Sequence, residues 1–395
     1  MKSAAIVKRL AGLGGDKWSV HLSAKDMLHA GHDIILMTIG EPDVGTPADL
    51  LNVADSRMRA GRTGYSDGRG ERGLCEALAE CYTRSRARRF TPANILCFPG
   101  TQTALFTVFL GLLEPGDEVL VGDPMYATYE GVIRAPGAKL VPVPLRPEAA
   151  FRMQASDLAA QITSRSRMIF LNTPHNPTGA ILTKDEIAEI GALAVKHDLW
   201  IVSDEVYEHL IFDEAEFVSP LAFPELANRV IGVSSISKSH AAPGFRSGWC
   251  VGPEAFCNAL LPLSESMLFG NQPFIADMTE YAIRHGSSVA AGMCWRYQAR
   301  SKRLAQRLEQ ETGLRVHQPQ AGMFALIDVS VTGLDGNSYA NDLLAKEGVA
   351  VMPGDAFGES TKNWVRVALT VNDQQFDLAI DRIITHAHSS IAAVS

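Results

Sequence analysis

Short apolar, β-branched runs recur between residues 95 and 235 and alternate with stretches of helical periodicity. The runs predict strands at Ile95–Phe98, Glu118–Val121, Lys139–Val143, Met168–Asn172, Trp200–Ser203 and Val230–Ser234. Between two of these runs, in TKDEIAEIGALAVKHD, Thr183 and Glu186 have the spacing of a capping box and precede an apolar stripe of helical period. The alternation predicts an α/β fold with a mainly parallel central sheet flanked by helices. In such sheets, ligands bind beyond the carboxyl ends of the strands.

The pattern changes at about residue 287. A long helical stretch, GMCWRYQARSKRLAQRLEQETG, is followed by a strand candidate, GMFALIDV, a second helix, SYANDLLAKEG, a strand pair and a last helix. This order predicts a smaller α+β domain. We expect residues 1–47 to form an N-terminal arm and part of the small domain, 48–286 a large ligand-binding domain, and 287–395 the small C-terminal domain.

Composition narrows the class of protein. The 395 residues suffice for two domains, and 46% apolar with 20% charged residues is typical of a globular enzyme. A net charge of −8 argues against nonspecific binding of nucleic acid, which needs a basic surface. The longest apolar run, TALFTVFLGLL, is shorter than the ~20 residues that span a bilayer, and the N-terminal segment lacks the apolar core of a signal peptide. We expect a cytoplasmic protein that binds neither membranes nor nucleic acid.

Several familiar motifs are absent or lie in the wrong context. The six cysteines form no CxxC pair and no zinc spacing with histidine, so we expect free thiols and no metal site. GRGERG, residues 68–73, matches G-x-G-x-x-G, but the turn-like AGRTGYSD stands where a dinucleotide motif needs a strand. No phosphate-binding G-x-x-x-x-G-K-[ST] loop occurs.

The predicted strand ends carry polar and aromatic side chains. In CFPGTQTAL, a strand leads through Pro99–Gln102 into a helix, whose N-terminus is either an anion site or an ordinary turn. Tyr126 follows the next strand, where it either stacks on a flat ligand or packs in its loop. Asn176, in NTPHNPTG, is either a hydrogen-bond donor to a ligand or part of an Asx-Pro turn.

Two further strand ends carry charged groups. Asp204 directly follows an apolar strand and is either the partner of a buried cation or a helix cap; it faces the same side as Tyr207 only if the chain turns there. In SSISKSHAAPGFRSGW, Lys238 lies among small residues and Arg246 follows eight positions later. Taken alone, Lys238 is most simply a surface lysine. The two cations serve one ligand only if the chain between them folds back.

One ligand requires all of these groups together. Pyridoxal 5′-phosphate needs a lysine for its aldehyde, a carboxylate for its pyridine nitrogen, a helix N-terminus and an arginine for its phosphate, an aromatic ring against its face, and donors to its phenolic oxygen. A metal site, a nucleophile triad or a nicotinamide site would account for only one or two of them.

The sequence resembles the fold-type-I, class I/II aminotransferases over essentially its whole length. The resemblance is carried, in this order, by GEPD (Gly40–Asp43), GYSDGRGERGLCEAL, PGTQTAL, DPMYATYE, NTPHNPTG, SDEVY, SISKSHAAPGFRSGW, PGDAFG and WVRVAL. The stretches KWSVH, HDLWIVSDEVYEHLIFD and SISKSHA are most similar to the bacterial arginine–pyruvate transaminases.

The resemblance implies a role for each site residue. Lys238 would form a Schiff base with the cofactor and move the substrate proton. Asp204 would pair with the pyridinium nitrogen, Tyr207 and Asn176 would bond the phenolic oxygen, and Tyr126 would stack on the ring.

The resemblance also implies groups for the phosphate and the substrate. The phosphate would be held by Gly100, Thr101, Gln102, Ser235, Ser237 and Arg246. Tyr65 would reach the phosphate of the neighbouring subunit, in a homodimer with shared active sites. Arg366 would bind the substrate α-carboxylate, with Gly40 and Asn176 nearby. Pro243 and Phe245 depart from the Thr and Trp frequent in the family, which leaves the shape of this loop open.

The implied activity is transfer of an amino group from an L-amino acid, with arginine as a candidate donor, to a 2-oxo acid such as pyruvate or 2-oxoglutarate. The alternatives are a β-lyase or another fold-type-I pyridoxal-phosphate enzyme, because the same scaffold and lysine serve those reactions. A DNA-binding regulator with an aminotransferase-like domain is a further class, but the chain has no spare residues for a helix-turn-helix domain.

Overall fold

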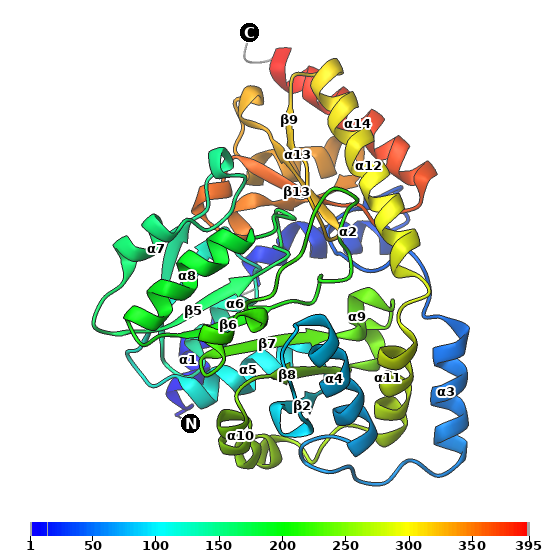
Figure 1. Ribbon diagram of the computed structural model, residues 1–395. Coiled ribbons are helices and arrows are strands. Elements are labelled where there is room, and N and C mark those ends of the chain that lie inside the picture. The colour runs from blue at the N-terminus through cyan, green and yellow to red at the C-terminus, as the bar shows by residue number, and fades with distance from the viewer. Residues whose placement is uncertain (1, 14, 393–395) are drawn as a thin grey trace.

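The computed structural model describes residues 2–13 and 15–392, and its centre is a seven-stranded sheet of order β2-β8-β7-β6-β5-β3-β4 (Figure 1). The strands are β2 (Ile95–Phe98), β3 (Glu118–Asp123), β4 (Lys139–Pro144), β5 (Ser166–Asn172), β6 (Trp200–Asp204), β7 (Val230–Ser235) and β8 (Gly248–Val251). Adjacent strands are parallel, except that β8 is antiparallel to both β2 and β7. The predicted strands and the mainly parallel α/β sheet are confirmed, and β8 is the one the sequence pattern missed.

Helices cover both faces of this sheet, because side chains of a buried strand alternate between the two faces. On β2, Ile95 and Cys97 join one core while Leu96 and Phe98 join the other. The helices on the first face are α3 (Ala48–Arg59), α4 (Arg72–Ser85), α7 (Ala155–Gln161), α8 (Lys184–Lys196) and α11 (Pro273–His285). Those on the second face are α5 (Thr101–Leu112), α6 (Tyr129–Arg134) and α10 (Glu254–Met267).

The capping box predicted for α8 is present. The hydroxyl of Thr183 accepts the Glu186 N–H at 3.2 Å, and the Glu186 carboxylate accepts the Thr183 N–H at 2.9 Å. In contrast, the described residues between α3 and α4 include no strand, so GRGERG lacks the strand that a dinucleotide motif requires.

The rest of the chain builds a second, smaller layer, which lies in the upper part of Figure 1. Its antiparallel sheet has the order β12-β13-β10-β9, and a separate parallel pair joins β1 to β11. The strands are β1 (Ile35–Leu36), β9 (Arg315–His317), β10 (Phe324–Asp328), β11 (Val349–Ala350), β12 (Met352–Pro353) and β13 (Trp364–Ala368). Its helices are α2 (Ser19–His29), α12 (Ala290–Glu311), α13 (Gly336–Glu347) and α14 (Asp373–Ala392). In contrast, α1 (Ala5–Leu10) packs against α6 of the large layer, and the short α9 (Ile236–Ser239) lies at the end of β7.

The large sheet has one core on each face, and the smaller layer has a further core around β10, β13, α12 and α14. The residue limits predicted for the domains, 1–47, 48–286 and 287–395, remain predictions. Within the described residues, the cysteines are free thiols and no helix is long and apolar enough to cross a membrane.

Candidate active site

A cavity of about 210 Å³ lies where the carboxyl ends of the large-sheet strands meet the smaller layer. Its lining includes most residues selected from the sequence: Gly40, Thr101, Gln102, Tyr126, Asn176, Asp204, Tyr207, Ser235, Ser237, Lys238, Arg246 and Arg366. The chain from Lys238 to Arg246 therefore folds back, as a shared ligand would require. The turn consists of a 3₁₀ segment, Pro243–Phe245, and of Arg246 in a left-handed conformation, with φ of 51°.

Lys238 lies on α9, directly after β7, and its amine points into the cavity. Its Nζ donates a hydrogen bond to the carbonyl oxygen of Gly40 at 2.6 Å. Burial lowers the pKa of Lys238 to about 8; the charges of Arg366 and Arg246 act in the same direction, and Glu41 opposes them. An amine with this pKa is partly neutral near pH 7–8, so it can both form a covalent bond and accept a proton.

Asp204 is a buried carboxylate at the end of β6, with 4% of its surface exposed. Its Oδ2 accepts a hydrogen bond from the Tyr129 hydroxyl at 2.8 Å, and its Oδ1 accepts the Val206 N–H at 3.2 Å. Burial raises the pKa of Asp204 to about 6, although both hydrogen bonds lower it. The strand ends at Asp204, and the turn that follows brings Tyr207 onto the same cavity.

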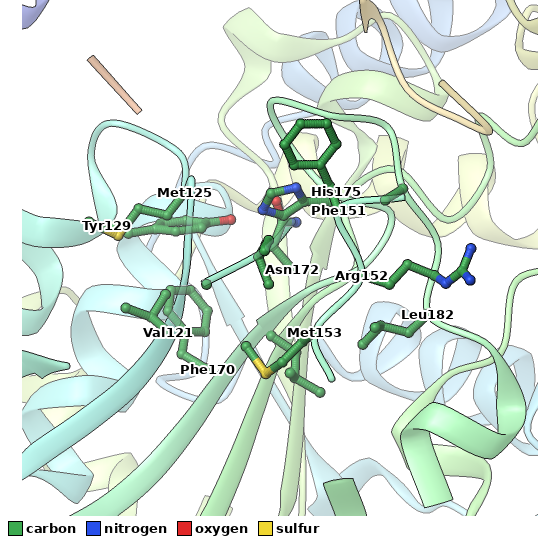
Figure 2. Close-up of a pocket in the computed structure, with 14 residues that line it drawn as sticks. Val121, Met125, Tyr129, Phe151, Arg152, Met153, Phe170, Asn172, His175 and Leu182 are labelled. Carbon is green, nitrogen blue, oxygen red and sulfur yellow. The ribbon is translucent and has the colours of Figure 1, made fainter. Parts of the chain in front are cut away.

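Asn176 is held in place by Asn172, the last residue of β5. The Asn172 Oδ1 accepts the backbone N–H of Asn176 at 2.8 Å, and its Nδ2 donates to the carbonyl oxygens of Pro174 and Asp204, both at 3.1 Å. Figure 2 shows Asn172, His175 and Tyr129 around a second, smaller cavity of about 30 Å³. Tyr129 lines both cavities and is therefore part of the wall between them.

Arg366 is a fully buried guanidinium on β13. Its Nη1 donates to Asn176 Oδ1 at 2.8 Å and its Nη2 to the Thr38 carbonyl oxygen at 2.6 Å. The rings of Phe324 and Phe357 lie 3.8 and 4.4 Å from its central carbon. Burial lowers the pKa of Arg366 to about 10, so it stays charged at neutral pH. Its Nε is buried without a hydrogen-bond partner among the described residues.

The turn between β2 and α5 is in close contact with Arg246. Gly100 has φ of 88°, and a Cβ there would come 2.3 Å from Arg246 Nη2. Gly248, at the start of β8, lies so close that its Cβ would be 2.8 Å from the Thr101 backbone nitrogen. The Thr101 hydroxyl is buried and has no partner within the described part of the chain. Because Gly100 and Gly248 have no side chain, the guanidinium of Arg246 and strand β8 can pack closely against the N-terminus of α5, where the Thr101 hydroxyl lies.

Two predicted residues, Gly100 and Tyr65, are not part of the cavity lining; Gly100 lies directly behind it against Arg246, whereas Tyr65 lies elsewhere on the surface. The Tyr65 side chain is 90% exposed and packs edge-to-face on Phe269, which is also exposed. Two groups that sequence reasoning missed are Tyr129 and the aromatic pair that encloses Arg366. Tyr129 lies three residues after Tyr126 at the start of α6, a spacing that places two side chains on one side of a helical turn. The packing of Phe324 and Phe357 on Arg366 depends on tertiary contacts between separate segments.

A mainly parallel α/β sheet, with a partly buried lysine, a buried carboxylate and a buried arginine around one cavity at its strand ends, defines the fold-type-I aminotransferase class. Comparison with known proteins agrees: residues 32–383 match the family model "Aminotransferase class I and II", and the chain belongs to this family. It is therefore an enzyme that transfers an amino group between an amino acid and a 2-oxo acid.

Individual relatives cover nearly the whole chain. An arginine–pyruvate transaminase of Pseudomonas aeruginosa is 40% identical over 97% of both chains. An aspartate aminotransferase of Musicola paradisiaca is 32% identical over 97% of this chain and 96% of the relative. The solved structure of Thermus thermophilus aspartate aminotransferase with maleate matches with a TM-score of 0.92 and 29% identity, and the match covers 98% of this chain and 100% of the other.

Proposed function

We propose that this aminotransferase works with pyridoxal 5′-phosphate bound through Lys238. The proposal rests on one observation above all: a partly buried lysine with a lowered pKa shares a cavity with a buried carboxylate and a buried arginine. When bound, this cofactor supplies a protonated ring that accepts the electrons of the substrate Cα–H bond. The described residues offer a group for each part of it.

The phosphate fits the turn between β2 and α5. The unpaired hydroxyl of Thr101, the N-terminus of α5 with Gly100 and Gln102, and the guanidinium of Arg246 would surround it, and Ser235 and Ser237 line the same wall. For the ring, Asp204 would accept the pyridine N–H, Tyr126 would pack on the face, and Asn176 and Tyr207 would donate to the phenolic oxygen.

The remaining groups would act on the substrate. Arg366 would bind the α-carboxylate, because it is charged, buried and partly unpaired, with Gly40 and Asn176 beside it. Lys238, once its amine is free, would take the proton from the substrate Cα. It would then deliver this proton to the cofactor carbon that is bonded to the substrate nitrogen. The Gly40 carbonyl oxygen is placed to hold this amine between steps.

The donor we propose is arginine, with pyruvate as the acceptor and 2-oxoglutarate as the alternative acceptor. The support is the 40% identity over nearly the full length with a protein named arginine–pyruvate transaminase. A panel of L-amino acids, each assayed with both oxo acids, tests it. Arginine should give the highest kcat/KM; an aspartate or aromatic donor that exceeds arginine would reject this donor but leave aminotransferase chemistry standing.

We also propose a homodimer with shared active sites. The support is the exposed aromatic pair Tyr65 and Phe269, which lies outside the cavity of its own chain and is available to a second copy. Tyr65 would then reach the phosphate bound by the partner.

The assignment of Lys238 can be tested directly. Borohydride treatment of the yellow holoenzyme should fix the cofactor covalently, and peptide mapping should place the adduct on Lys238. Lys184, an exposed lysine at the start of α8, is a matched control whose replacement by Ala should leave the labelling unchanged. An adduct on another lysine, or none in a protein that binds the cofactor, would contradict the assignment.

A further inference from the structure

Backbone and ring contacts hold Tyr129 in place. It is the first residue of α6, only 3% exposed, and its backbone N–H donates to the Tyr126 carbonyl oxygen at 3.0 Å. Its ring packs on Phe170, with centroids 4.5 Å apart, and edge-to-face on Tyr126 at 5.5 Å. Since these contacts fix the ring on two sides, the hydroxyl has little freedom to leave its position.

The Tyr129 hydroxyl contacts the carboxylate of Asp204. It donates to Oδ2 of Asp204 at 2.8 Å, while Oδ1 accepts the Val206 N–H. The carboxylate is therefore held by one donor on each oxygen, one from helix α6 and one from the turn after β6, and its plane is fixed. Asp204 forms no ion pair within the described residues, so these two donors are its polar support in the cavity.

We propose that Tyr129 is a positioning residue for the reaction: it orients Asp204 and keeps it ionised so that it can hold the proton on the cofactor's ring nitrogen. This rests on the proposed function, because it assumes that Asp204 faces the ring nitrogen. Burial, and with it the charge of Asp204, also raises the pKa of the neighbouring hydroxyls of Tyr126 and Tyr207, but the hydrogen bond to Asp204 comes from Tyr129. Tyr126 and Tyr129, three residues apart, thus have different roles, one against the ring face and one behind the carboxylate.

The Tyr129→Phe holoenzyme tests the proposal, since Phe keeps the ring packing and removes the donor. We expect kcat/KM to fall about ten-fold, the effect of one hydrogen bond to a charged group. The pH midpoint of the visible absorption change, which reports the proton on the Lys238 nitrogen, should move up by about 0.5 unit, because a less fully protonated ring repels that proton less. Tyr82→Phe is the matched control: it is a buried tyrosine whose oxygen accepts one hydrogen bond, from Trp249 Nε1 at 2.9 Å, in the core around the other face of the sheet.

A double-mutant cycle with Asp204→Asn shows whether the effect passes through Asp204. In the Asn background, Tyr129→Phe should cause no further shift of the optical midpoint. A shift of the same size there, or no difference between Tyr129→Phe and Tyr82→Phe, would overturn the proposal. If Asp204→Asn itself leaves activity and spectrum unchanged, the proposed function of Asp204 fails; if it abolishes activity while Tyr129→Phe has no effect, only the role of Tyr129 fails.

Discussion

The large sheet and the smaller layer each bring one buried charge to the cavity, Asp204 on β6 and Arg366 on β13. Both are held by neutral groups: hydroxyl and amide donors for the carboxylate, carbonyl and amide acceptors with two aromatic rings for the guanidinium. Burial raises the pKa of Asp204 and lowers that of Arg366, so each charged form is destabilised in the free cavity. A buried charge without a counter-ion is typical of a binding site, because the ligand supplies the opposite charge.

The residue next to Asp204 shows the opposite arrangement. Glu205 faces away from the cavity and pairs with the buried Arg86, which also contacts Glu208. Burial raises the pKa of Glu205 to about 7, but its cationic partner lies within the chain, so it has no need of a ligand. The neighbouring carboxylates Asp204 and Glu205 therefore differ in role. Glu205 belongs to a structural ion-pair cluster, whereas Asp204 can accept a cationic group of a ligand.

The largest effect expected is that of Asp204→Ala on the reaction. The variant should still bind the cofactor but lose several orders of magnitude in kcat, as expected for removal of an electrostatic element of about 3–4 kcal/mol or more. Steady-state and single-turnover rates measure it, with the exposed Asp26→Ala as the control. A rate near that of the wild type would show that the charge from the large sheet is not used in catalysis.

Arg366→Lys tests the charge from the smaller layer. A lysine keeps the charge but loses the planar pair of donors. We expect transition-state stabilisation to fall by about 3 kcal/mol, which lowers kcat/KM roughly a hundred-fold, mainly through a higher KM. Arg315→Lys, on β9 of the same sheet and largely exposed, is the matched control. An unchanged KM for all amino acids would mean that the α-carboxylate binds elsewhere.

The two charges also predict different pH dependence of the ligand-free protein. The folded pKa of Asp204, about 6, lies above its unfolded value of 3.8, so the folded state binds more protons between these values and stability falls as pH rises through this window. Replacement by Asn removes this loss, which amounts to about 2–3 kcal/mol above pH 6. Arg366 remains charged over the same range, because its lowered pKa is still about 10.

Denaturant unfolding of ligand-free wild type and Asp204→Asn at pH 4 and pH 8 measures this difference. The variant should gain stability relative to the wild type at pH 8 and little or none at pH 4. Equal differences at the two pH values would mean that Asp204 titrates as an exposed carboxyl does.

The smallest effect is expected for Tyr65→Phe, which tests the predicted contact of Tyr65 with the cofactor bound by a second chain. Cofactor retention should weaken by the order of one hydrogen bond to a charged group, about 1.5–3 kcal/mol. Sharing is isolated by mixing two inactive proteins, Lys238→Ala and Tyr65→Glu, under conditions that exchange subunits. Mixed dimers would contain one site with both native residues, so activity should return; demonstrated mixed dimers without activity would refute shared sites.

Part of this protein follows directly from the sequence. The short apolar runs, the capping box at Thr183 and the polar residues at strand ends are local patterns, and they predicted the strands of the large sheet other than β8, helix α8 and most of the residues around the cavity. The strand β8 was missed because its four residues, GWCV, are short and follow the turn at Arg246, where the sequence indicates a loop.

The sequence by itself determined which chemical groups lie at which strand ends. Apolar runs and turn residues indicate strands and their ends over only a few positions, so this information is local. The tertiary structure decided how those groups are supported. The hydrogen bond from Tyr129 to Asp204, the rings of Phe324 and Phe357 around Arg366, and the contact of Gly248 with Thr101 each join segments far apart in the chain. Such contacts depend on strand order and packing, which no local pattern specifies, and burial by that packing is what shifts the pKa values of Lys238, Asp204 and Arg366.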